Sequence, residues 1–183
     1  MSNRILSIGS MFPTYTKKAV VSVAAGKEFA DITSEDHKQD GKWMVMFWYP
    51  KDFTFVCPTE IVEFDAHMEE FAKNNSVLIG ASTDSEFSHL GWRMSHPDLK
   101  GLRIPLLADT SKSLAEELGI LTDPEKVAYR TTYIVDPTGV IRWVCQNDLD
   151  VGRDIPEVLR VLEALQTGKL TPCNWKPGQK TLN

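Results

Sequence analysis

The sequence predicts an α/β fold with a central mixed β-sheet flanked by helices, and two observations carry this prediction. Residues 43–49 and 77–82 are short apolar runs typical of buried strands, and a helical pattern lies between them. Strands connected in this way are expected to pair in parallel through a right-handed crossover. Residues 131–135 and 140–146 flank the turn sequence Asp-Pro-Thr-Gly at 136–139, which indicates an antiparallel hairpin.

The N-terminal half is expected to hold two weak strands and two helices besides these runs. The weak strand signals lie at 20–23 and 29–33, within an irregular entry segment of residues 1–42. The first helix is expected to run from Cys57 to about residue 74, because apolar residues recur there at helical spacing. Asp84 or Ser85 can cap the second helix, which is expected to place Phe87, Leu90 and Met94 near one face.

The C-terminal half is expected to begin with a strand at 104–108 and a helix at 111–118, closed by Gly119. After the hairpin, apolar residues at 155, 158, 159, 162 and 165 predict a long helix that ends at Gly168. The remaining residues have little periodicity, but Leu170, Trp175 and Leu182 give them apolar anchors. We therefore expect one domain over 1–168 and a flexible C-terminal arm over 169–183.

Composition limits the possible partners and compartment. The 183 residues suit a single domain, with 42% hydrophobic and 25% charged residues. A net charge of −5, a pI of about 5.4 and the lack of a Lys/Arg cluster argue against nucleic acid and against an anionic membrane surface. The first residues lack the apolar run of a signal peptide, and no apolar segment reaches transmembrane length. The expected location is cytoplasmic.

Residues 50–60 carry the strongest functional signal. They read Pro-Lys-Asp-Phe-Thr-Phe-Val-Cys-Pro-Thr-Glu, so Cys57 falls where an apolar strand gives way to a helix. Pro58 suits the first helical position, since its missing N–H costs nothing there. The helix dipole and the unpaired backbone N–H groups favour a thiolate at such a position. Cys57 is therefore a candidate nucleophile. Thr54 can offer its hydroxyl to the substrate, and Pro50 can shield the loop from water.

This stretch resembles the active-site signature of the peroxiredoxins, Pro-x-x-x-Thr-x-x-Cys. The chain is similar over almost its whole length to the typical two-cysteine peroxiredoxins of the alkyl hydroperoxide reductase C branch. The resemblance implies a thioredoxin-like fold and a thiol-specific peroxidase. Such an enzyme reduces hydrogen peroxide and organic hydroperoxides to water and alcohols, and its nucleophile becomes a sulfenic acid.

The resemblance also assigns roles to three charged residues. Arg130 matches the family arginine whose fixed fork of donors holds thiolate and peroxide together. Glu60 and Arg153 match a carboxylate and an arginine that orient this first arginine. Each of these two could equally form a surface ion pair that contributes little.

The sulfenic acid requires a second thiol, and the chain has three cysteines, none of them in Cys-x-x-Cys spacing. In a reducing cytosol, a disulfide between such distant cysteines would be transient and catalytic. Cys173 is the candidate because it lies in the arm beside Trp175. The resemblance implies an intersubunit disulfide between Cys57 and Cys173. In many relatives the resolving cysteine stands four residues before the tryptophan, where this chain has Thr171.

Cys145 is the one rival to Cys173 as resolving cysteine. It alternates with Ile141 and Trp143 along its strand, so the three side chains are expected to share one face. We interpret Cys145 as a thiol packed in the core or at an interface.

No cofactor or metal site is predicted. The four histidines, His37, His67, His89 and His96, are expected to be solvated or capping residues. On one helix His89 and His96 would lie about 10 Å apart, too far to share a metal ion. The chain also lacks a phosphate-binding loop, so no nucleotide or flavin is implied.

The expected partners are a peroxide substrate and a separate disulfide reductase, which could be flavin-linked, thioredoxin-like or of another kind. The resemblance implies a homodimer that assembles into a decamer or dodecamer, and strand 140–146 is expected to pair with its twin. Two other functions stay open at this point. One is a holdase chaperone, and the other is a one-cysteine peroxidase resolved by an external thiol.

Overall fold

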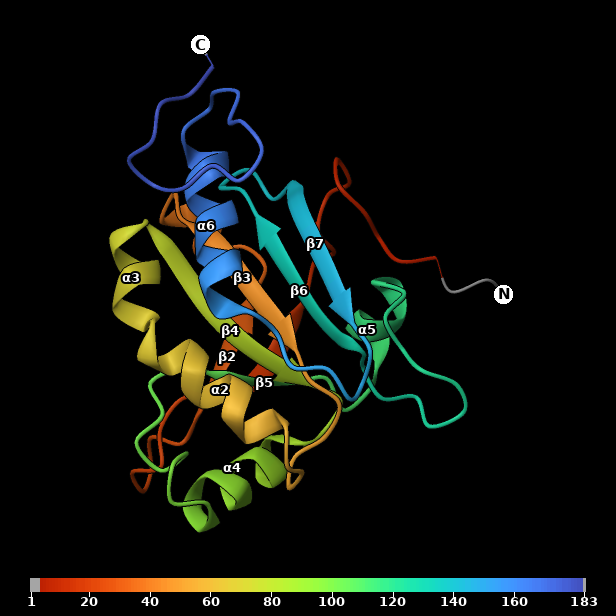
Figure 1. Ribbon diagram of the computed structural model, residues 1–183. Coiled ribbons are helices and arrows are strands. Elements are labelled where there is room, and N and C mark those ends of the chain that lie inside the picture. The colour runs from red at the N-terminus through yellow and green to blue at the C-terminus, as the bar shows by residue number, and fades with distance from the viewer. Residues whose placement is uncertain (1–3, 183) are drawn as a thin grey trace.

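The computed structural model of the chain describes residues 4–182, and a seven-stranded mixed sheet forms its centre (Figure 1). The strands lie in the order β2-β1-β5-β4-β3-β6-β7. β3 is parallel to β4, as the crossover predicts, and β6 and β7 form the predicted hairpin. The predicted fold class is therefore confirmed. The strands are β1 (Thr16–Val20), β2 (Phe29–Thr33), β3 (Trp43–Trp48), β4 (Ser76–Ser82), β5 (Leu106–Ala108), β6 (Arg130–Val135) and β7 (Ile141–Asn147).

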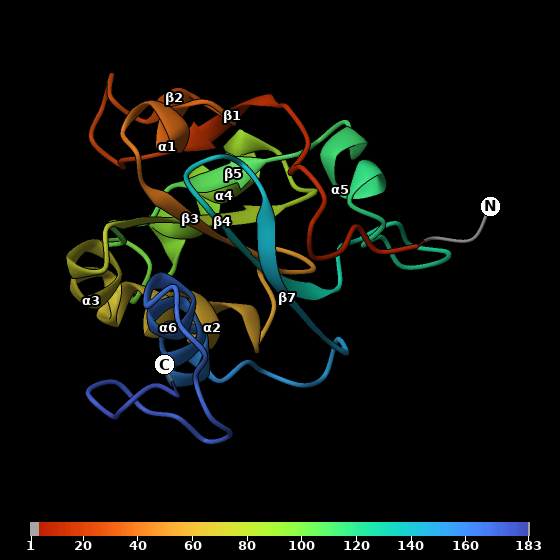
Figure 2. The ribbon, with the colours of Figure 1, turned by 90° about the horizontal axis from the view of Figure 1, so that it is seen from above.

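Helices cover both faces of this sheet. Seen from above, α2, α3 and α6 gather on one side of the sheet and α5 lies on the other (Figure 2). Successive residues of β3 serve the two layers: Met46 packs in the core on the α5 side, and Phe47 packs against α2 and α6. Burial on both faces explains why this strand reads as a continuous apolar run. The helices are α1 (Asp36–Gln39), α2 (Cys57–Ala66), α3 (Met68–Lys73), α4 (Glu86–Ser95), α5 (Ser113–Glu117) and α6 (Ile155–Gln166).

The single helix expected from Cys57 to residue 74 is two helices, with a break at His67. The backbone of His67 leaves the helical region at φ −93° and ψ 6°. Its ring Nδ1 lies 2.9 Å from the carbonyl oxygen of Glu63, which the backbone N–H of His67 also approaches at 3.3 Å. The apolar spacing was right about the buried face, since Phe64 and Phe71 are both in the core, but side-chain spacing does not record a backbone break.

The face expected for α4 is wrong. Phe87 and Met94 are 68% and 59% exposed, and the buried side chains of this helix are His89, Trp92 and Arg93. Arg93 donates to the carbonyl groups of Val20 and Leu102. His89 and Arg93 are thus buried at positions that the spacing of apolar residues assigned to the solvent-facing side of the helix. Ser85 does cap the helix, accepting from the N–H of Ser88.

The expectation that all four histidines are solvated or capping is wrong for two of them. His89 is fully buried and His37 is 3% exposed. Burial lowers the pKa of His37, because its charged form loses hydration.

The expected alternation along β7 is also wrong, because the hairpin contains a bulge. The register shifts between Ile134 and Val135, so Ile141 pairs with Val135 while Trp143 pairs with Ile134. Ile141 therefore packs in the core on the α5 side and Trp143 on the α6 side. Ile141 and Trp143 do not share a face.

Several element boundaries shift by a few residues. β1 covers 16–20 rather than 20–23, β5 begins at 106 and α5 at 113. The glycine stops are where the sequence places them. At Gly119 φ is +69°, and a Cβ there would lie 2.4 Å from the carbonyl oxygen of Arg4, so only glycine fits. Within residues 4–182, no helix is long and apolar enough to cross a membrane.

Candidate active site

Cys57 is the first residue of α2, and the loop from β3 delivers it to the sheet face beneath α6. Pro58 is the second residue of α2, one position later than predicted, and still lies in the first turn. The Cys57 side chain is fully buried and packs with the core residues of this face, including Tyr49 and Ile61. Pro50 is buried in the same loop. Thr54 is half-buried, and its hydroxyl donates to the carbonyl oxygen of Lys51 at 3.0 Å.

Arg130 lies directly at the sulfur. It is the first residue of β6, and since β6 pairs with β3 its side chain is directed to the end of the sheet where Cys57 lies. Arg130 Nη1 donates to Cys57 Sγ at 3.4 Å and to Glu60 Oε2 at 2.7 Å, while Nε donates to the carbonyl oxygen of Leu149 at 2.7 Å. Burial alone would lower the pKa of Arg130, but the hydrogen bond to Cys57 and the Glu60 carboxylate raise it.

Glu60 joins two arginines into one buried unit, which we call the Glu60 clamp (Glu60, Arg130 and Arg153). Arg153 meets Glu60 with both ends of its fork, Nε to Oε1 at 2.9 Å and Nη2 to Oε2 at 2.8 Å. All three side chains are at most 4% exposed. The sequence left open a surface ion pair for Glu60 and Arg153, and this burial excludes it.

Further contacts fix the position of Arg153. Its guanidinium carbon lies 5.3 Å from the ring centre of Phe47 and 5.6 Å from that of Phe64. Nη1 donates to the carbonyl oxygen of Trp48 at 2.9 Å. Burial lowers the pKa of Arg153, and the Glu60 carboxylate opposes this effect. With two guanidinium groups and one carboxylate, the clamp has one unbalanced positive charge. It is therefore suited to an anion at the position of Sγ.

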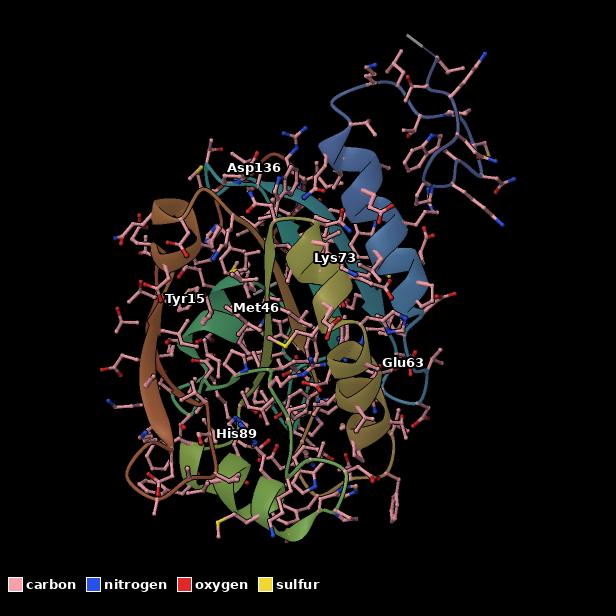
Figure 3. The ribbon with its side chains drawn as sticks, turned by 90° about the vertical axis from the view of Figure 1, so that its left-hand side faces the viewer. Tyr15, Met46, Glu63, Lys73, His89 and Asp136 are labelled. Atoms are coloured by element: carbon pink, nitrogen blue, oxygen red, sulfur yellow. The ribbon has the colours of Figure 1, made fainter. Side chains whose placement is uncertain are left out.

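A second polar cluster fixes the loop that carries Cys57, and sequence reasoning missed it. His89 Nδ1 lies 2.8 Å from Asp52 Oδ2, and Tyr49 donates to Asp52 Oδ1 at 3.0 Å. His89 reaches this cluster from α4 (Figure 3). Burial raises the pKa of Tyr49 well above its usual value, and Asp52 adds to the effect. The presence of Asp52 within the motif was the one sequence signal for this cluster. Its partners Tyr49 and His89 lie outside the motif.

The two other cysteines are free thiols on other segments of the chain. Cys173 is exposed in the arm that follows α6, whereas Arg153, which precedes that helix, belongs to the clamp beside Cys57. Cys145 is half-buried on β7, with Sγ 3.6 Å from Asn147 Oδ1. The structure thus brings Cys57, Glu60, Arg130 and Arg153 together, with Pro50 and Thr54 in the adjoining loop, and leaves Cys173 apart. Across residues 4–182 no group of three or more potential metal ligands occurs.

A buried cysteine at a helix start, held against an arginine on a thioredoxin-like sheet, is the arrangement that defines the peroxiredoxin class. Residues 8–144 match the AhpC/TSA family, and residues 164–183 match the C-terminal domain of 1-Cys peroxiredoxin. The chain belongs to the AhpC/TSA family and is a thiol-dependent peroxidase.

Relatives of the chain agree with this assignment. Alkyl hydroperoxide reductase C of Mycobacterium tuberculosis is 44% identical over 187 residues, covering 98% of this chain and 94% of its own length. Peroxiredoxin-2 of Mus musculus is 43% identical, covering 100% of this chain and 92% of its own length.

Solved structures show the same likeness. The structure of Mycobacterium bovis AhpC is 44% identical, with a TM-score of 0.85 over 94% of this chain and 99% of its own. That of reduced Plasmodium vivax 2-Cys peroxiredoxin is 29% identical, with a TM-score of 0.87 over 96% of this chain and 92% of its own.

Proposed function

We propose that the chain reduces hydrogen peroxide and organic hydroperoxides through Cys57, with Cys173 of a second subunit as the resolving thiol. The observation that carries the proposal is the 3.4 Å contact between Arg130 Nη1 and Cys57 Sγ within the Glu60 clamp. It supports a thiolate beside donors that can also hold a peroxide oxygen as negative charge develops on it.

The first step is attack of the Cys57 thiolate on one peroxide oxygen. The O–O bond breaks, an S–O bond forms, and the second oxygen leaves as alkoxide or hydroxide, which takes a proton to become alcohol or water. Arg130 stabilises the leaving oxygen, Glu60 and Arg153 hold Arg130 in place, and Pro50 and Thr54 shape the pocket. Cys57 is left as a sulfenic acid.

The second step forms the disulfide. The Cys173 thiolate attacks Sγ of the sulfenic acid, the S–O bond breaks, and the oxygen leaves as water after protonation. Because Cys57 is fully buried, the first turn of α2 must open to admit the second sulfur. A separate disulfide reductase, flavin-linked, thioredoxin-like or other, then returns both thiols with two electrons. We place the cycle in the cytoplasm, where such reductases keep thiols reduced.

We further propose that the catalytic unit is a homodimer, assembling into a decamer or dodecamer. β7 is one of the two edge strands of the sheet, and its edge suits two-fold pairing with a second copy. The exposed apolar side chains Phe87 and Met94 on α4 suit a second interface between dimers. Residues 1–168 would form the folded domain, and residues 169–183, of which Asn183 lies outside the described residues, the arm.

Mass spectrometry after one equivalent of peroxide tests the assignment. We expect a Cys57–Cys173 disulfide linking two subunits, loss of all turnover in Cys57→Ser, and a persistent Cys57 sulfenic acid in Cys173→Ser. A Cys57–Cys145 disulfide would show that Cys145 is the resolving cysteine. A sulfenic acid that persists in the unaltered protein would indicate the one-cysteine alternative.

A further inference from the structure

The arm contains a tight turn that leaves Cys173 exposed. Trp175 is buried, and its backbone N–H donates to the carbonyl oxygen of Pro172 at 3.1 Å. This bond closes a tight turn with Cys173 and Asn174 at its corners, and Asn174 adopts φ +57°. Arg160 on α6 donates to the Trp175 carbonyl oxygen at 3.2 Å and so anchors the turn. Figure 3 shows the arm projecting beyond α6, and Cys173 is exposed on it.

The arm is purely basic on an acidic protein. Residues 169–183 contain Lys169, Lys176 and Lys180 and none of the 25 acidic residues. The other 168 residues hold 17 of the 20 Lys and Arg against all 25 Asp and Glu, a net charge of −8. All three lysines are exposed, and within residues 4–182 none of them forms an ion pair.

The arginine that anchors the turn adds no net charge, because it is already paired with a carboxylate. Arg160 pairs with Glu157 on its own helix at 2.5 Å. The pKa of Arg160 is raised first by its hydrogen bond to Glu157, and Cys173 adds to the increase, so the guanidinium lies within electrostatic reach of the thiol. The apolar side chains of Leu170 and Leu182, 63% and 68% exposed, supply contact area on the same arm.

We propose that the arm is a basic docking surface for the disulfide reductase, and that this partner carries its attacking thiol within an acidic surface. An acidic partner is repelled by the body of the chain and attracted by the arm. The field therefore orients the encounter so that the two sulfurs meet. The inference rests on the proposed function, because it requires Cys173 to be part of the catalytic disulfide.

The exchange chemistry places the attack on Cys173 rather than on Cys57. The reductase thiolate attacks Cys173 Sγ, the Cys57–Cys173 bond breaks, and Cys57 leaves as a thiolate that the Glu60 clamp can receive. A second reductase thiolate then attacks the mixed disulfide and releases Cys173. The chain gains two electrons and the reductase is oxidised to a disulfide. The sulfur that is attacked thus belongs to the same segment of the chain as the three lysines.

Three matched two-carbon thiols test the charge preference without knowledge of the reductase. The oxidised protein is reduced with 2-mercaptoethanesulfonate (anionic), 2-mercaptoethanol (neutral) and cysteamine (cationic), and each rate is expressed per thiolate. At low ionic strength we expect the anionic thiol to react on the order of 10-fold faster than the cationic one. The ratio should approach one near 1 M salt, where the Debye length is about 3 Å.

Two triple variants locate the effect. Lys169→Gln/Lys176→Gln/Lys180→Gln should reduce the ratio to less than about 2-fold, since the local field is removed. Lys18→Gln/Lys27→Gln/Lys100→Gln changes the net charge equally at exposed positions outside the arm and should keep the ratio of the unaltered protein. Both variants should react with peroxide at the unaltered rate, because neither touches Cys57 or the Glu60 clamp.

The outcomes separate this inference from the function on which it rests. A mapped Cys57–Cys173 disulfide with no charge preference, or with equal loss in both triple variants, would overturn the docking surface and leave the proposed function in place. A disulfide mapped to other cysteines would overturn the resolving step, and this inference with it. A preference that only the arm variant loses would support both.

Discussion

Arg130 and Arg153 share one carboxylate, and this sharing gives the two arginines different tasks. Arg153 uses both ends of its fork on Glu60, together with the Trp48 carbonyl group and two aromatic rings. Arg130 donates only one hydrogen bond to Glu60, and the same nitrogen also donates to Cys57. The position of Arg153 is therefore fixed by several contacts. Arg130 retains N–H donors that could bind an oxygen of the peroxide.

Replacing Arg130 should consequently affect chemistry more than folding. We expect Arg130→Ala to slow the oxidation of Cys57 by peroxide by about 10²-fold or more, as when one charge-stabilising donor is removed. Stopped-flow measurement of the first oxidation step provides the rate. Arg142→Ala is the matched control, because Arg142 is 46% exposed and pairs with Asp136 at the hairpin turn. Equal rates in the two variants would assign Arg130 a structural role only.

His37 should make the protein less stable in mild acid. Burial lowers its pKa below the ordinary value of 6.5, so the unfolded chain binds a proton more readily than the folded one. The free energy of unfolding therefore falls as pH decreases through about 6.5. In His37→Leu this fall should be smaller between pH 7 and 5, as measured by urea denaturation at each pH.

His67→Leu is the control for that experiment, since His67 lies between α2 and α3 with its ring only partly buried. If His37→Leu and the unaltered chain lose stability in parallel, the acid sensitivity comes from other groups.

At the scale of elements, local sequence predicted correctly those features whose determining residues lie close together in the chain. The start of α2 at Cys57 and the turn at 136–139 are both of this kind. The Glu60 clamp is different, because Arg130 and Arg153 lie 70 and 93 positions after Glu60 in the sequence. Only the resemblance linked them, and their burial was left open. The buried face of α4 was missed because its polar residues find partners on distant elements.

The bulge in the hairpin has a consequence for the free edge at β7. It leaves Val144 opposite Tyr133 and only partly buried, near the middle of the edge strand. If two copies pair through this edge, Val144→Glu brings a carboxylate to the paired strands and opposes association. We expect its sedimentation to shift toward the monomer.

Val144→Ala loses the same packing but adds no charge, so it should keep the oligomeric state. Far-ultraviolet circular dichroism of both variants shows whether the fold is retained. Full-size oligomers of a folded Val144→Glu would place the dimer interface on another surface.

At the scale of the whole molecule, the direction of α6 bears on whether Cys57 and Cys173 can react within one protomer or only between two. The helix has 12 residues and so spans about 18 Å, with the Glu60 clamp near its first turn and the arm beyond its last. Figure 1 shows the arm beyond the C-terminal end of α6, and the clamp that contacts Cys57 lies at the other end of this helix, so Cys57 and Cys173 of one chain lie apart. If two copies pair about a two-fold axis through the β7 edge, as we propose, the partner runs in the opposite direction, and each arm reaches toward the end where the partner carries Cys57.

Mixing of protomers tests this arrangement directly. Cys57→Ser and Cys173→Ser proteins should each lack turnover with a disulfide reductase, because each has only one member of the pair. After dissociation and random reassociation, half of the dimers are hybrids, and each hybrid has one intact pair of Cys57 and Cys173. Turnover should then recover to roughly one quarter of that of the unaltered protein, since exchange in a two-fold dimer is statistical. Pairing within one chain would give no recovery, because no protomer in the mixture carries both cysteines.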